Sequence, residues 1–281
     1  MNVTQTPPVR KPFGFTRRRD RWWVEPLLNF CGFTAFVLYA TWAASSFKMH
    51  GHITYAWPPV QFDQGLGHAP YLSPFYSPLF KPNWWVLSPA WLILIMPLGF
   101  RLTCYYYRKM YYRSYFMDPP GCAVADSKMW HTKLRNYKGE TVFPFTLQNL
   151  HRWFFYLASA VLIVLWYDAI NSLWFQAPGG GPVVFHFGLG SAIMFINAFL
   201  LSGYSLGCHA FRHLIGGNVD CWSCTALGRT RHGLWKIVSK FNEHHLGWAW
   251  ASLTSVALTD VYIRLLAGGF GNHPFPYTPW W

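Results

Sequence analysis

The sequence has few charged residues for its length. Only 12% of its 281 residues are Asp, Glu, Lys or Arg, against about 25% in an ordinary globular protein, and only ten are acidic. This shortage argues against soluble domains. The chain is instead 52% hydrophobic and 20% aromatic, and its 17 Trp and 16 Tyr suit a membrane protein with aromatic belts at both interfaces.

Several signatures are missing altogether. The sequence contains no internal repeat, no low-complexity tract and no inverted repeat of the kind found in secondary transporters. The first 26 residues are basic and contain prolines, with no short apolar core followed by a cleavage site, so we expect the first apolar segment to be retained.

Five apolar segments are each long enough to cross about 30 Å of hydrocarbon as a helix. They predict an all-α integral membrane bundle of five transmembrane helices, with a proline-rich outer loop that caps it. The predicted spans are 27–47, 84–106, 152–175, 183–207 and 246–267, flanked by a basic arm at 1–26, cytoplasmic loops at 107–151 and 208–245, and an outer tail at 268–281.

The distribution of basic residues predicts the orientation. Of the 23 Lys and Arg residues, only Lys48, Lys81 and Arg264 fall on the side opposite the amino terminus. By the positive-inside rule the amino terminus is cytoplasmic, and we expect a multi-pass protein of the plasma membrane. The basic residues behind the net charge of +13 lie between apolar segments and form no basic domain. Membrane lipid is therefore the expected partner, and nucleic acid is not.

One segment is dense in metal-binding side chains. It reads Cys208-His209-(x3)-His213-(x7)-Cys221-(x2)-Cys224 and follows the fourth predicted span on the cytoplasmic side. Thiols stay reduced there, so a Cys-x-x-Cys motif favours metal binding over a structural disulfide. We therefore predict a bound metal at the edge of the membrane.

The spacing divides the segment into two pairs. If the helix continues past residue 207, His209 and His213 share one face, and Cys221 and Cys224 can reach one ion from a single turn. Two imidazoles and two thiolates suit either a Rieske-type [2Fe–2S] cluster or a zinc ion. The spacing alone does not choose between iron and zinc.

Other interpretations remain open. A membrane scaffold with a structural zinc site fits the same ligands, and a haem-b anchor needs two histidines on different helices at one depth. A di-iron desaturase is disfavoured because Phe241 replaces a histidine of its second motif. The haem candidates are His151, His209 or His213, and His244 or His245.

Two polar features lie inside predicted spans. Asp260 and Arg264 are four residues apart in the fifth span, and this spacing predicts a local ion pair near the outer face. Asn197, in the middle of the fourth span, predicts an interhelical hydrogen bond.

The motifs together resemble a known family. The five spans, the Cys208–Cys224 segment and the following Asn-Glu-His-His at 242–245 are similar to the membrane-anchor subunit of the actinobacterial, mycobacterial-type succinate dehydrogenase 1. The resemblance implies an anchor that holds a flavoprotein subunit and an iron–sulfur subunit at the cytoplasmic face. Electrons would then pass to a quinone, either menaquinone or ubiquinone, in a respiratory complex that could form a higher oligomer.

The resemblance also implies a cofactor and a site. It implies a haem-free anchor with an embedded Rieske-type [2Fe–2S] cluster, so haem b is not expected. The ligands would come from five candidates, of which Cys208 is the least favoured and His209, His213, Cys221 and Cys224 are preferred. The quinone pocket would be lined by Tyr204, Trp222, Trp153 and Arg152.

Overall fold

The computed structural model describes residues 11–45, 60–61, 68–69, 71–78, 80, 82, 84–85, 87–127, 141, 143, 145–176, 182–217 and 219–266. The predicted outer tail and the first ten residues of the arm lie outside these ranges. The chain forms two compact units, which we describe separately. The first comprises Met1–Ala35 and Leu102–Asn149, and the second comprises Phe36–Arg101 and Leu150–Trp281.

A helix overlaps each of the five predicted spans. These helices are α1 (Val24–Ser45), α2 (Pro89–Leu102), α5 (His151–Asn171), α6 (Leu189–Leu206) and α9 (His245–Leu266). In the described part of the chain, three helices are long and apolar enough to cross a membrane: Val24–Ser45, Thr146–Asn171 and Leu189–Leu206. The apolar α2 has 14 residues. The protein is therefore a mostly helical membrane protein, and its five-span topology stays a prediction.

Four short strands correct the expectation of an all-helical chain. They are β1 (Val60–Gln61), β2 (His68–Ala69), β3 (Trp174–Gln176) and β4 (Val183–Phe185), and they form one antiparallel sheet in that order. The last residues of the third predicted span thus pair with the first residues of the fourth. Periodicity could not reveal this, because a short apolar strand and a buried helix end look alike in sequence.

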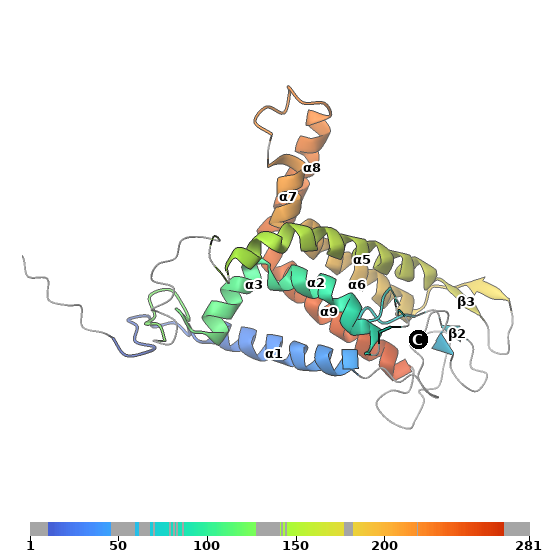
Figure 1. Cartoon of the computed structure of the whole chain (residues 1–281), viewed down its shortest axis with the longest axis horizontal. Helices are drawn as coiled ribbons and strands as arrows, with labels where there is room; N and C mark the ends of the chain where they lie inside the picture. The colour runs from blue at the N-terminus through green and yellow to red at the C-terminus, as the bar shows by residue number, and fades with distance from the viewer. Residues whose placement is uncertain are drawn as a thin grey trace, which may run out of the picture. The chain divides into compact units, whose positions relative to one another are not determined.

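The predicted cytoplasmic loop 208–245 is largely helical. It contains α7 (His209–Gly216) and α8 (Gly228–Glu243), which pack on each other and project as a hairpin from the bundle beside the amino-terminal end of α5 (Figure 1). Arg231 Nε donates to the carbonyl of Ile215, one of the last acceptors of α7, at 2.9 Å. Gly216 of α7 also lies against the Trp222 and Trp235 indoles, so polar and aromatic contacts both hold the hairpin together.

Helix α6 is the central element of the second unit, because it packs against both α5 and α9. Gly203 lies so close to the Trp248 indole that a Cβ atom would overlap it, and a small residue at a helix contact allows this approach. Ser255 of α9 donates to Asn197 Oδ1 of α6 at 3.1 Å. The predicted interhelical hydrogen bond of Asn197 is thus confirmed.

A buried ion pair joins α9 to its neighbours. Arg264 Nε donates to Asp260 Oδ2 at 2.6 Å, which confirms the predicted local pair. Both side chains are almost fully buried, at 3% and 0% exposure. Asp260 also accepts hydrogen bonds from Tyr39 Oη, at 2.6 Å, and from Ser73 Oγ. Ser73 belongs to the stretch 71–77, whose side chains are buried in the core of the unit and do not merely cap it.

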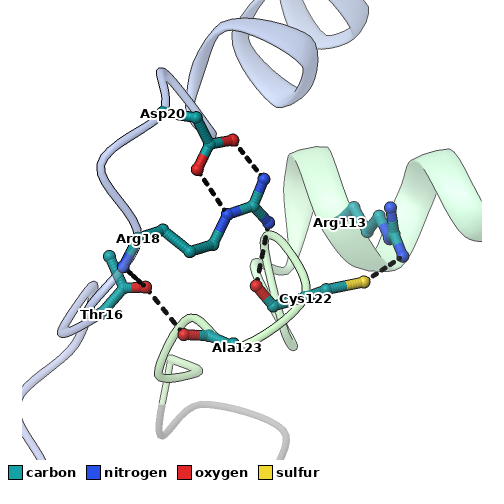
Figure 2. A network of polar contacts seen from close by, with 6 residues as sticks. All are labelled: Thr16, Arg18, Asp20, Arg113, Cys122 and Ala123. Carbon is teal, nitrogen blue, oxygen red and sulfur yellow. Dashed lines mark hydrogen bonds and ion pairs between the residues drawn. The ribbon is translucent and has the colours of Figure 1, made fainter.

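The basic arm is ordered within the first unit. Figure 2 shows Arg18 between two partners: its guanidinium pairs with Asp20, and its Nη1 donates to the carbonyl of Cys122 at 2.9 Å. Thr16 Oγ1 donates to the carbonyl of Ala123 at 2.8 Å. The hydrogen bond from Arg18 lowers the pKa of Asp20, because it favours the ionised carboxylate. The described part of the arm is thereby tied to the segment after α3 (Tyr105–Met110).

Candidate metal and quinone site

The predicted cysteine pair lies at the tip of the α7–α8 hairpin. Cys221 and Cys224 are joined by a disulfide, whereas we expected reduced thiols. The backbone of Gly228 approaches the Trp222 carbonyl so closely that no side chain would fit there. Thr225 Oγ1 closes the turn by donating to the Cys221 carbonyl at 3.0 Å. The turn therefore holds the two sulfur atoms in a disulfide, which offers no thiolate to a metal ion.

The predicted histidine pair shares one helix, but that helix is α7 and not a continuation of α6, which ends at Leu206. Cys208 is the N-cap of this helix, so His209 is its first residue and His213 lies one turn later. Both histidines line the same open pocket of about 260 Å³. The pocket is lined by His209, Arg212, His213, Gly216, Gly217, Val219, Trp222 and Trp235.

The two pairs do not form a shared ligand set. Across the described ranges, no group of three or more His, Cys, Asp or Glu side chains is arranged to hold a metal ion. The cysteines close on each other at the turn, and neither contributes to the pocket of the histidines. The donor types of the preferred set suit a [2Fe–2S] cluster, but their arrangement in this structure does not.

Cys208 has a different environment from the other candidates. Its side chain is 2% exposed, and its Sγ lies 3.0 Å from His151 Nε2 at the start of α5. The His151 ring stacks on Phe100 near the end of α2, with ring centres 4.7 Å apart and planes at 10°. The thiol and the imidazole, 57 residues apart in sequence, thus meet inside the bundle.

Further rings continue from this pair. Phe100 contacts Tyr204 of α6 edge-on at 5.3 Å, and Tyr204 stacks on His245, the first residue of α9, at 4.9 Å. The Arg101 guanidinium lies 4.5 Å above the Tyr204 ring. Arg101 also donates to Ser252 Oγ at 2.9 Å, which fixes its position against α9. The ends of α2, α5, α6 and α9 therefore meet in one buried cluster of aromatic and cationic groups.

The predicted quinone residues lie in three places. Tyr204 is buried in the cluster just described, and Trp222 lies in the hairpin pocket. Trp153 is 67% exposed on α5, next to Arg152, whose Nε donates to Tyr156 Oη at 3.2 Å.

Sequence reasoning missed part of the buried cluster. Phe100 and Arg101 fall at the cytoplasmic end of the second predicted span and were given no site role, and His151 was considered as an interfacial residue or a haem ligand. The sequence does contain a signal for them: an aromatic residue is followed by an arginine at the end of a predicted span. Two histidines are predicted to lie at the same depth in the membrane.

The fold and site together define a class of protein. Among the described residues, three helices that are long and apolar enough to cross a membrane, with short apolar helices beside them, define a mostly helical integral membrane protein. Comparison with known proteins identifies the family.

The family profile described as "Actinobacterial succinate dehydrogenase subunit SdhC" matches residues 24–269. No curated protein sequence matches the chain. A solved structure, "Mycobacterium smegmatis Sdh1 complex in the apo form", contains a similar chain with 39% identity and a TM-score of 0.71, covering 94% of this chain and 95% of that one. The chain belongs to the actinobacterial SdhC family: it is a membrane-anchor subunit of a succinate dehydrogenase complex.

Proposed function

We propose that this chain anchors the soluble subunits of succinate dehydrogenase to the plasma membrane and delivers their electrons to a quinone. The single observation that carries this proposal is the family match over residues 24–269. The soluble partners are a flavoprotein subunit, which oxidises succinate, and an iron–sulfur subunit. Both dock on the cytoplasmic face.

The charge distribution supports this orientation. With five spans and a cytoplasmic amino terminus, 20 of the 23 basic residues face the cytoplasm. The ordered arm of the first unit, held by Arg18 and Thr16, presents part of that basic surface. An ordered surface loses less conformational entropy on docking than a disordered tail would.

The quinone reaction requires two electrons and two protons for each quinol formed. Tyr204 and Arg101 lie in the buried cluster, where a guanidinium and a phenol can orient a quinone carbonyl through hydrogen bonds. The His245 imidazole also belongs to this cluster, because it stacks directly on Tyr204. Trp222, Trp153 and Arg152 remain proposed contacts for the quinone ring or tail.

A [2Fe–2S] cluster remains part of the proposal, with zinc as the alternative metal. His209, His213, Cys221 and Cys224 have suitable donor atoms, but this structure does not bring the four together. We therefore derive no electron-transfer step through that set.

The test compares two activities of the purified complex. Wild-type complex in lipid should reduce both an artificial electron acceptor and a quinone with succinate. The soluble subunits expressed without this chain should keep the first activity, lose the second, and no longer sediment with membranes. If they still reduce quinone at the wild-type rate, the proposed role of this chain is wrong.

A further inference from the structure

We propose that the α7–α8 hairpin lies on the membrane surface and binds anionic lipid headgroups through the outer face of α8. The inference goes beyond the proposed electron transfer and does not depend on it. Its starting point is a set of unpaired charges. Arg229, Lys236 and Lys240 are exposed on α8, and within the described ranges none of the three has an ion-pair partner.

The hairpin begins and ends at the membrane. Helix α7 follows α6, which is long and apolar enough to span, with only Gly207 and Cys208 between them. Helix α8 is followed by α9 after His244. In Figure 1 the hairpin runs across the direction of α5 and α6 instead of continuing it. A hairpin that turns sideways where a spanning helix ends lies along the membrane surface.

Two of the five Lys and Arg residues of the hairpin are used inside it. Arg212 Nε of α7 donates to Ser239 Oγ of α8 at 2.9 Å. Arg231 Nε of α8 donates to the carbonyl of Ile215, also at 2.9 Å. These contacts fix one side of α8 against α7, so the side that carries the other three charges faces outward.

The outer face of α8 has two parallel stripes. The basic stripe consists of Arg229, Lys236 and Lys240, whose spacings of seven and four residues place them on one side of the helix. Beside it lie Leu234 and Ile237, which are 48% and 55% exposed. A helix of this kind lies in the membrane interface, because its apolar side chains enter the acyl boundary while the long basic side chains reach the headgroups.

The charge of this face favours anionic lipid. Glu243, at the last position, is the only acidic residue of α8. Each Lys or Arg close to an anionic membrane surface strengthens binding by about fivefold, so three together should give a preference of roughly 100-fold over a neutral surface. Lysine is depleted at protein–protein interfaces, so lipid fits this face better than a docked subunit does.

The test is a photo-cross-link from the outer face of α8. Ile237 is replaced by photoreactive p-benzoylphenylalanine, and the whole complex is placed in nanodiscs of equal phosphatidylglycerol and phosphatidylcholine. Irradiation should attach lipid at position 237, with phosphatidylglycerol adducts in clear excess. The same probe in place of Ile163, which is 71% exposed near the middle of α5, is the control and should give equal yields of the two lipids.

A charge variant tests the basic stripe directly. Arg229→Gln, Lys236→Gln and Lys240→Gln combined should remove the excess of phosphatidylglycerol adducts at position 237. A matched control removes three exposed charges from the arm of the first unit and should leave the excess unchanged: Arg17→Gln, Arg19→Gln and Arg21→Gln.

The identity of the cross-linked partner decides the outcome. Adducts at position 237 to the iron–sulfur subunit, or to a second copy of this chain, overturn the proposal because a protein then covers the outer face of α8. Equal yields of the two lipids at this position overturn it as well. Quinone reduction is measured separately on the same samples, so a failure of the proposed function is distinguished from a failure of this inference.

A second measurement needs no substitution. Acetylation of Lys236 and Lys240 by a water-soluble reagent is followed by mass spectrometry in wild-type complex. It should be slower in nanodiscs that contain phosphatidylglycerol than in phosphatidylcholine alone, because an ammonium group paired with an anionic headgroup is less available to the reagent. Equal rates overturn the proposal even if the variants fail to assemble.

Discussion

Asp260→Asn should destabilise the second unit strongly. The change keeps the size of the side chain but leaves the buried Arg264 cation without its counter-charge. Both groups are nearly inaccessible to water, and Asp260 additionally accepts hydrogen bonds from Tyr39 and Ser73. Removing one partner of a buried pair typically costs about 3–5 kcal/mol, because an uncompensated charge remains in a low-dielectric environment.

The assay is thermal unfolding of the complex in lipid nanodiscs. With about 2–4 °C per kcal/mol for a domain of this size, Asp260→Asn should lower the midpoint by roughly 6–20 °C. Leu258→Ala, an exposed position on the same helix, is the control and should change little. The double variant Asp260→Asn with Arg264→Met should recover most of the loss, since no unpaired charge then remains. If the double variant is as unstable as the sum of the single variants, the reasoning from charge burial is wrong.

Two further predictions concern the packing of the helices and the hairpin. Asn197→Leu should lower the free energy of unfolding by about 0.6–1.7 kcal/mol in the same assay, because it removes the hydrogen bond that Ser255 donates. Ser255→Ala should lower it by an equal amount. If the double variant loses the sum of the two amounts, the contact does not contribute to stability. Gly228→Ala should open the hairpin turn, because the added methyl group overlaps the Trp222 carbonyl, and limited proteolysis should then cut residues 217–227 faster than in wild type. Gly233→Ala, at an open position of α8, is the matched control and should be cut at the wild-type rate.

The sequence predicted features that depend on local pattern. Apolar length gave a helix within each of the five expected segments, because a backbone in hydrocarbon must satisfy its own hydrogen bonds. The spacing of four residues correctly placed Asp260 beside Arg264 and His209 on the same pocket as His213. The motif segment also pointed to the right family.

The sequence did not predict the contacts that form where the chain reverses direction. The second helix of the connection 208–245 was not predicted, yet α7 and α8 form a hairpin stabilised by contacts such as that between Arg231 and Ile215. Residues 183–185 were assigned to a span, yet they pair as β4 with β3. Neither partner was visible in the local pattern.

The candidate site shows the same division. The sequence by itself determined which thiols and imidazoles the chain carries and that several of them follow the fourth predicted span, while the metal that they bind stays a prediction. Only the tertiary structure decided which of them meet. His151 and Cys208 are 57 residues apart and come together because α5 and α6 pack side by side, whereas Cys221 and Cys224 are neighbours in sequence but lie on an exposed turn. Spacing can predict contacts within one helix or turn, but contacts between helices depend on packing.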